Sequence, residues 1–429
     1  MRFADGRAST PYEDQVLVQR PIVGWQTCQI GIRQRGGRLA LNFCVCWRMG
    51  SPMKMLTMRA PRWSRSCILA ALMAAALGSV AALPVQAQSV CPSANQTSSP
   101  LDTWLGTAGG HPLVGTILAG AEPLMAAADV CSPSPLVQLR STLTAHVAGG
   151  GLLLLGEVHD NGAQHALRGH LLGAIAADLA RQGRPAPALV FEHIRTDQAA
   201  GLNPNLASAP APAIARERAR DLLARLEWDK SGWPAAELFL PIFEAAMKHA
   251  LPIVPGHPTR AEVRDVARRG LGALPADTVA RLALDVPLPE PLATALLDEL
   301  EASHCGLMPR TAFTTMALAQ RYRDAHLAAS LTTAAARHGT AILLAGNGHV
   351  RTDRGVPRDL ARIAPERKII AVAFIEVDDG NVDAGSYVPR DPSGAPAADY
   401  VVLTPRTARA DPCEAMRAQF KKGRYPFAD

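Results

Sequence analysis

Short apolar runs alternate with stretches of helical periodicity along most of the chain. Runs at residues 151–156, 188–192, 341–346 and 368–377 predict strands buried on both faces, and 252–255 is a shorter candidate. Apolar positions recur at helical spacing over 163–182, 214–226, 235–249 and most of 259–338. Strands separated by helices predict βαβ units. We therefore expect a layered α/β fold with a mainly parallel sheet flanked by helices, and a mostly helical insertion.

The remaining segments set the expected boundaries of this domain. Residues 88–112 are rich in Ser, Thr, Pro and Gly and predict an irregular lead-in. Residues 378–398 predict a loop, and 413–420 a short terminal helix. We expect a single α/β domain over residues 113–429.

Charge is distributed unevenly along the chain. Residues 1–87 hold 11 of the 44 basic residues but 3 of the 38 acidic ones, a net charge of +8, which leaves −2 for the rest. Within this segment a basic stretch at 58–65, an apolar run at 67–80 and Val85-Gln86-Ala87 form the three parts of a secretory signal. We expect cleavage after Ala87 and a periplasmic or secreted protein. Loss of the basic segment also removes the compositional support for nucleic-acid binding.

A membrane anchor and an additional N-terminal module are less favoured interpretations of the N-terminus. The apolar run has 14 residues, whereas a membrane-spanning helix needs about 20, so we expect peripheral or no membrane association. Residues 1–57 show no clear period and precede a self-sufficient signal. We interpret them as an over-extended gene start rather than a module of the mature protein.

The cysteines are consistent with export. Four remain after residue 87, namely Cys91, Cys131, Cys305 and Cys413, and none has the spacing of a metal site or a haem attachment motif. Two disulfides can form in three connectivities. We expect Cys91–Cys131 and Cys305–Cys413, because the first pair brackets one N-terminal segment.

Polar side chains gather where three of the predicted strands end. Glu157 and His159 follow the first strand, Glu192 and His193 end the second, and His349 follows the run at 341–346. Ligands collect at the carboxyl ends of parallel strands. Imidazoles and carboxylates at one rim suit metal ligation, acid–base chemistry or axial ligation of haem iron. The alternative is that these residues cap helices or lie solvated on the rim.

Glu157, His159 and His349 lie in two sequence blocks, 155–161 followed by His165, and 344–350 followed by Gly355-Val356-Pro357. Three further blocks occur at 226–234, 304–309 and 319–324. Together they resemble the ChaN-like family of the haem-binding uptake and Tiki superfamily. The resemblance implies a mainly parallel α/β fold, shared with erythromycin-esterase-like proteins, and an exported, iron-regulated protein that binds haem. More distant branches are metal-dependent proteases and esterase-like hydrolases.

The resemblance also suggests site residues. Glu157, His159, Glu192 and His349 match the acidic and histidine positions of the superfamily and would be the catalytic residues of a hydrolase. Glu157, His159 and His349 would then bind a divalent metal. The candidate haem-binding residues are His159, His165, Tyr322 and His349.

The sequence departs from the family pattern at two positions. Gln164 stands where many relatives have a further histidine, and His257 lies in a loop where asparagine is common.

These residues leave the function open between two main classes. The first is an exported haem-binding protein of iron or haem uptake, for which haem is the expected partner and a homodimer one option. The second is a metal-dependent hydrolase with Glu157 as the general base. Whether the protein is an enzyme, or a binding module with no chemistry of its own, is not decided by the sequence.

Overall fold

The structure is a computed structural model. It describes residues 33–35, 38–40, 110–124, 134–202 and 212–421. The chain divides into two compact units, Met1–Gln88 and Ser89–Asp429. In the first unit, β1 (Arg33–Arg35) pairs antiparallel with β2 (Arg38–Ala40). The predicted signal at 58–87, the lead-in up to residue 109, and Cys91 and Cys131 lie outside the described residues.

The second unit is built on an eight-stranded sheet. Its strands are β3 (Ile117–Ala119), β4 (Glu122–Pro123), β5 (Leu152–Leu155), β6 (Ala188–Arg195), β7 (Ile253–His257), β8 (Ala341–Leu344), β9 (Ile369–Glu376) and β10 (Tyr400–Thr404). Their order is β4-β3-β10-β9-β5-β8-β6-β7. The six strands from β10 to β7 are parallel, and β3 and β4 add an antiparallel edge. The predicted α/β fold with a mainly parallel sheet is confirmed.

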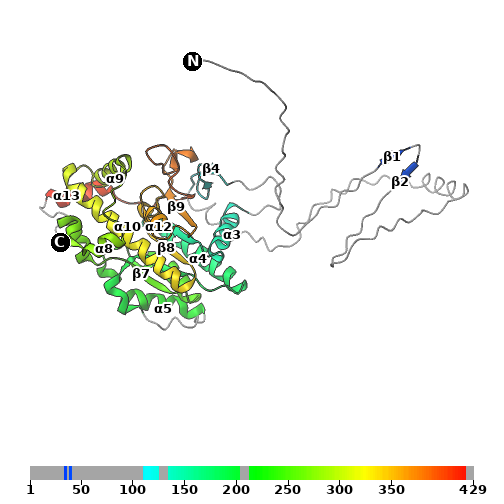
Figure 1. Ribbon diagram of the computed structural model, residues 1–429, viewed down its shortest axis with the longest axis horizontal. Coiled ribbons are helices and arrows are strands. Elements are labelled where there is room, and N and C mark those ends of the chain that lie inside the picture. The colour runs from blue at the N-terminus through cyan, green and yellow to red at the C-terminus, as the bar shows by residue number, and fades with distance from the viewer. Residues whose placement is uncertain (1–32, 36–37, 41–109, 125–133, 203–211, 422–429) are drawn as a thin grey trace, which may run out of the picture. The chain divides into compact units, whose positions relative to one another are not determined.

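Helices cover both faces of this sheet (Figure 1). One layer contains α3 (Pro135–Ala148), α4 (Gly162–Arg181), α5 (Pro212–Arg225) and α6 (Ala236–Lys248). The other contains α10 (Arg310–His338) and α12 (Val356–Ile363). Leu153 and Leu155 of β5 pack into the first layer, and Leu152 and Leu154 into the second. Because successive strand residues face opposite ways, a strand between two helical layers must be apolar throughout.

The stretch between β7 and α10 is helical, as predicted. It contains α7 (Arg260–Arg269), α8 (Ala276–Arg281) and α9 (Glu290–Ser303), separated by glycine- and proline-containing breaks. Val266 of α7 packs with Tyr322 of α10 in a separate small core. This insertion lies beside α10 rather than over the centre of the sheet.

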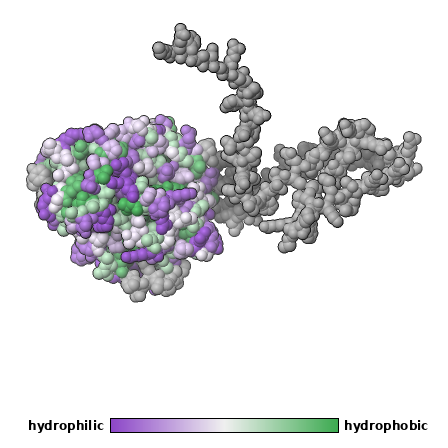
Figure 2. Space-filling model, in the orientation of Figure 1, coloured by the Kyte–Doolittle hydropathy of each residue, from purple (hydrophilic) through white to green (hydrophobic). Residues whose placement is uncertain are grey.

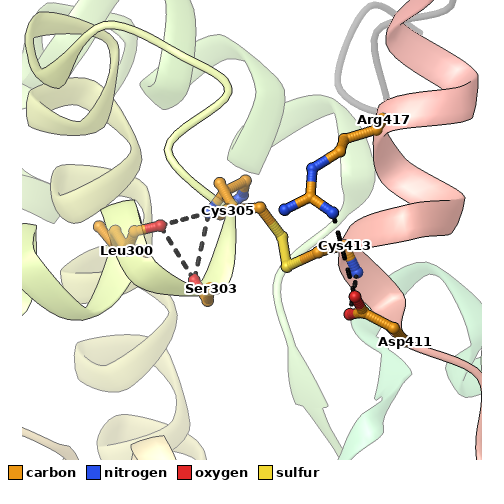
Figure 3. The surroundings of a disulfide bond; sticks show 7 residues. Leu300, Ser303, Cys305, Asp411, Cys413 and Arg417 are labelled. Atoms are coloured by element: carbon orange, nitrogen blue, oxygen red, sulfur yellow. Dashed lines mark hydrogen bonds and ion pairs between the residues drawn. A yellow bond between two sulfur atoms is a disulfide. The ribbon is translucent and has the colours of Figure 1, made fainter.

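The C-terminal segment is tied to the insertion by a disulfide. Cys305, just after α9, is bonded to Cys413 at the start of α13 (Pro412–Lys421), as Figure 3 shows. The predicted Cys305–Cys413 pair and the predicted terminal helix are therefore both confirmed. No residue of α13 is buried, so the disulfide is a main attachment of this helix.

The surface mixes residue types. The face in Figure 2 interleaves hydrophilic and hydrophobic residues, and the large apolar side chains exposed in the described part are Ile214, Val286 and Val382. Among the described helices, none is both long and apolar enough to span a bilayer.

Candidate functional site

Three neighbouring strands bring the predicted polar residues to one rim of the sheet. In the order β5-β8-β6, each of these parallel strands ends at the same edge. Glu157 and His159 follow β5, Glu192 and His193 belong to β6, and His349 lies on the short helix α11 (Asn347–Val350) after β8. All but His159 are buried.

Gly346 allows the loops after β5 and β8 to meet closely. A Cβ atom at this position would lie 2.9 Å from Cε1 of His159 and 3.6 Å from Oε2 of Glu192. The main-chain N–H of Gly346 also donates to that Glu192 oxygen over 2.7 Å. The glycine of the second sequence block therefore provides the space in which the histidine of the first block sits.

Glu157 is the centre of the first cluster of side chains. Its Oε1 atom accepts hydrogen bonds from Nδ1 of His159 (2.8 Å) and Nε2 of His193 (2.7 Å). Its Oε2 atom forms an ion pair with the fully buried Arg168 of α4 and lies 3.4 Å from Nδ1 of His165. A buried carboxylate needs such partners to remain ionised. Glu157 thus holds His159 and His193 through one oxygen while Arg168 balances its charge.

Burial keeps two of the surrounding imidazoles, His165 and His193, neutral. It lowers the pKa of His165 to about 4 and the pKa of His193 well below its usual value. The same desolvation lowers the pKa of Arg168 to about 9. At neutral pH the buried part of this cluster therefore contains the Glu157–Arg168 ion pair and the uncharged rings of His165 and His193.

His159 has the most accessible ring in the cluster. Its side chain is 38% exposed, and its ring lies against the indole of Trp233 with 4.8 Å between centroids. Nδ1 is held by Glu157, and Nε2 has no hydrogen-bond partner among the residues that the structure describes. A carboxylate that accepts from one ring nitrogen fixes the tautomer and leaves a lone pair on the other. His159 is therefore set up to bind a ligand through Nε2.

His349 forms a second, separate cluster. Its Nδ1 lies 2.6 Å from Oδ1 of Asp324 and its Nε2 lies 3.1 Å from Oε1 of Glu192. Burial opposes a charge on this ring, but Glu192 and then Asp324 outweigh it and raise the pKa of His349 to about 10. The imidazolium in turn holds the pKa of Glu192 well below its usual range, despite burial. His349 is thus charged at neutral pH, with both ring nitrogens engaged, and is not arranged as a metal ligand.

A different trio has the spacing of a metal site. Ligand atoms of Glu157, His159 and His193 lie within 4.8 Å of one another. His193 takes the place in which the sequence led us to expect His349. The oxygens of Glu157 are already engaged, because both rings contact one of them and Arg168 pairs with the other. A divalent cation would have to displace those contacts, so the fit to a metal is poorer than the spacing alone indicates.

The other predicted residues lie in less accessible places. His165 is fully buried, with Nε2 2.9 Å from the carbonyl oxygen of His159, and positions the loop rather than facing outward. Tyr322 lies in the core of the helical insertion, apart from both clusters. Gln164 contacts the main chain of Val158 and Phe374, so it braces the loop where relatives have histidine. His257 is largely buried, and desolvation lowers its pKa to about 4.

Sequence reasoning did not select three residues that complete the site. In the sequence, His193 stands out only as the neighbour of Glu192. Trp233 and Asp324 stand out only as members of the blocks at 226–234 and 319–324. Asp324 lies one helical turn after Gln320 on α10, and both residues contact His349.

Comparisons with solved structures find chains of low sequence identity. Among solved structures, ChaN of Campylobacter jejuni, described in a cofacial haem-binding structure, is 18% identical with a TM-score of 0.45, over 61% of this chain and 90% of that one. The type III effector HopBA1 is 13% identical with a TM-score of 0.32, over 62% and 94% of the two chains. No curated protein gives a significant match.

The family comparison covers half of the sequence. The model described as "Haem-binding uptake, Tiki superfamily, ChaN" matches residues 143–360. This span runs from the end of α3 to α12 and includes every residue of both clusters. The chain belongs to the ChaN family of the haem-binding uptake and Tiki superfamily.

Proposed function

We propose that this protein is an exported haem-binding protein of haem or iron uptake, and that Nε2 of His159 is its haem ligand. The observation that carries the proposal is the pairing of His159 with Glu157. A partly exposed imidazole, fixed through Nδ1 by a buried carboxylate, is the arrangement that prepares Nε2 for a metal centre.

The neighbouring residues fit a haem better at His159 than at the other candidates. His165 and His349 have both ring nitrogens in contacts and little or no exposure. Tyr322 is buried elsewhere. The proposal therefore narrows the four candidate haem-binding residues to one.

Four of the chain's own residues would take part in haem binding. His159 binds the iron, Glu157 holds the His159 N–H and strengthens the basicity of the ring, and Trp233 offers an indole beside the ligand position. Haem, when bound, would supply the iron centre and any redox chemistry. Arg168 keeps Glu157 ionised so that the carboxylate continues to accept from His159.

Export is supported by the pattern at residues 58–87 and by the disulfide of the second unit. Disulfides persist in oxidising compartments and are uncommon in the cytosol. We propose the periplasm or the extracellular space as the location. N-terminal sequencing of the exported protein should begin at Gln88, and an exported chain that retains residue 1 would contradict this assignment.

A haem titration tests the central proposal. The purified protein should develop the absorption band of ligated haem, and His159→Ala should lose most of the affinity. His249→Ala is the matched control, because His249 ends α6 at the opposite edge of the sheet, before β7. Unchanged haem affinity in His159→Ala, with wild-type circular dichroism, would contradict the proposal.

The alternative is a metal-dependent hydrolase, favoured by the spacing of Glu157, His159 and His193. The hydrolase differs from the haem-binding protein in that it would depend on His193 as a metal ligand. The His193 side chain is nearly inaccessible to solvent. Two results together would favour this function over haem binding. The haem-free purified protein would contain stoichiometric metal, and His193→Ala would lose both this metal and a hydrolytic activity.

A further inference from the structure

A basic groove lies next to the His159 site. It has a volume of about 410 Å³ and runs between the turn after β6, the corner that joins α5 to Trp228–Lys230, and the start of α7. Its charged lining residues are Arg195, Arg225, Lys230, Arg260, Asp197 and Glu227. Four cations against two carboxylates give the groove a formal excess of positive charge.

Two of these cations are not neutralised within the groove. Arg195 pairs with Asp197 over 3.0 Å, and Lys230 pairs with Glu227 over 2.7 Å. Arg260 donates to main-chain carbonyl oxygens, including that of Ser231, and so keeps its charge. Arg225 is exposed at the end of α5 and has no hydrogen bond or ion pair to any residue in the described part of the chain. In the described part of the chain, the guanidinium groups of Arg225 and Arg260 thus have no carboxylate partner, and they are suited to bind carboxylates or phosphates.

One tryptophan separates this groove from the haem ligand. The main-chain N–H of Trp233 donates to Oγ of Ser231, which lines the groove, over 3.1 Å. The indole of the same residue packs against the ring of His159. The indole Nε1–H of Trp233 also donates, over 3.0 Å, to the carbonyl oxygen of His193, which precedes the groove residue Arg195 by two positions on β6. A ligand bound at His159 and Trp233 would have the groove at its edge.

We propose that this groove binds the two propionate carboxylates of haem when the iron is bound at His159. The inference rests on the proposed function and extends it to the orientation of the ligand. Haem is an apolar ring with two carboxylates on one edge, so a basic groove beside an aromatic wall distinguishes that edge from the others. Arg225 and Arg260, the exposed cations of the groove without a carboxylate partner in the described part of the chain, are the ones expected to make this contact.

The test compares haem with haem dimethyl ester, in which both carboxylates are blocked. Each is titrated by absorption into the wild type, Arg225→Ala/Arg260→Ala and the control Arg337→Ala. Arg337 is exposed at the end of α10, which precedes β8 and so lies at the opposite edge of the sheet. The double variant should bind haem about tenfold more weakly, from the loss of charge-assisted contacts. Its affinity for the ester should stay at the wild-type level, and the control should match the wild type for both ligands.

The outcomes separate this inference from the function on which it rests. Equal affinity of the double variant and the wild type for haem would overturn the role of the groove and leave haem binding intact. Equal losses for haem and its ester would also overturn it, because the loss would not involve the carboxylates. Failure of the wild type to bind either ligand would instead overturn the proposed function. Arg225→Lys keeps the charge in place and should retain most of the haem affinity.

Discussion

Arg409 forms a two-bond ion pair with Asp160, the residue that follows His159. Its Nε and one terminal nitrogen lie 2.8 and 2.7 Å from the two carboxylate oxygens of Asp160. The same guanidinium contacts both oxygens of Glu376 at 2.7 Å. The C-terminal segment is therefore fastened to the loop that carries the proposed haem ligand, four residues before the disulfide at Cys413.

This contact predicts an effect of Arg409 on ligand binding. Arg409→Ala should lower the free energy of unfolding by about 1–2 kcal/mol, because it removes a two-carboxylate network that is partly shielded from solvent. It should also weaken haem binding several-fold by loosening the His159 loop. Arg406→Ala is the control, since Arg406 pairs with Asp378 where both side chains are more than half exposed. Equal haem affinity in the two variants would contradict a positioning role for Arg409.

Gly346 should be intolerant of even one methyl group. In Gly346→Ala the new Cβ would lie 2.9 Å from the His159 ring, so the ring must move from its place beside Glu157. We expect a loss of haem affinity of at least tenfold with the circular dichroism spectrum preserved. Gly272→Ala is the matched substitution, because a Cβ there meets nothing within 4 Å. Wild-type haem binding by Gly346→Ala would show that the His159 ring position is not required.

The charged His349 predicts a specific dependence of stability on pH. Its pKa is raised from 6.5 to about 10 in the folded protein. Its contribution is therefore complete below about pH 6.5 and is lost as the pH rises toward 10. The stability difference between the wild type and His349→Gln, measured by denaturant unfolding, should shrink by a few kcal/mol between pH 6.5 and 10. A difference that is constant over this range would mean that His349 is not a buried imidazolium.

The disulfide should stabilise the second unit. It closes a loop of 108 residues, for which the chain-entropy model gives a few kcal/mol. Cys305→Ser/Cys413→Ser should therefore lower Tm, and thiol counting on unreduced, unfolded exported protein should find no free thiol at either position. An identical Tm for the double variant would contradict this stabilising role and would mean that the disulfide only attaches α13.

Much of the fold follows from local pattern, and the exceptions have local causes. β5, β6, β8 and β9 are predicted because strands buried on both faces are apolar at every position. β10 is not predicted because its five residues follow a long irregular loop. α3 is not predicted because it lies before the first clear apolar run. The antiparallel edge strand β3 has only three residues.

The site was predictable to the extent that its residues lie directly after strands. Glu157 and His159 follow β5 in this way, and Glu192 lies in the last half of β6; the structure brings all three to one rim. The charge on His349 could not be predicted, because it depends on Asp324, 25 residues away on a different element. The contact between Arg409 and Asp160 spans 249 residues and leaves no pattern in the sequence.

Chemical rescue of the ligand position tests the central claim most directly. His159→Gly removes the imidazole and leaves a space beside Glu157 and Trp233, and the absorption spectrum of its haem complex is recorded with and without added imidazole. If His159 is the ligand, the variant alone should lack the wild-type spectrum, and imidazole should restore both the spectrum and most of the haem affinity. A wild-type spectrum in His159→Gly without imidazole would contradict the assignment.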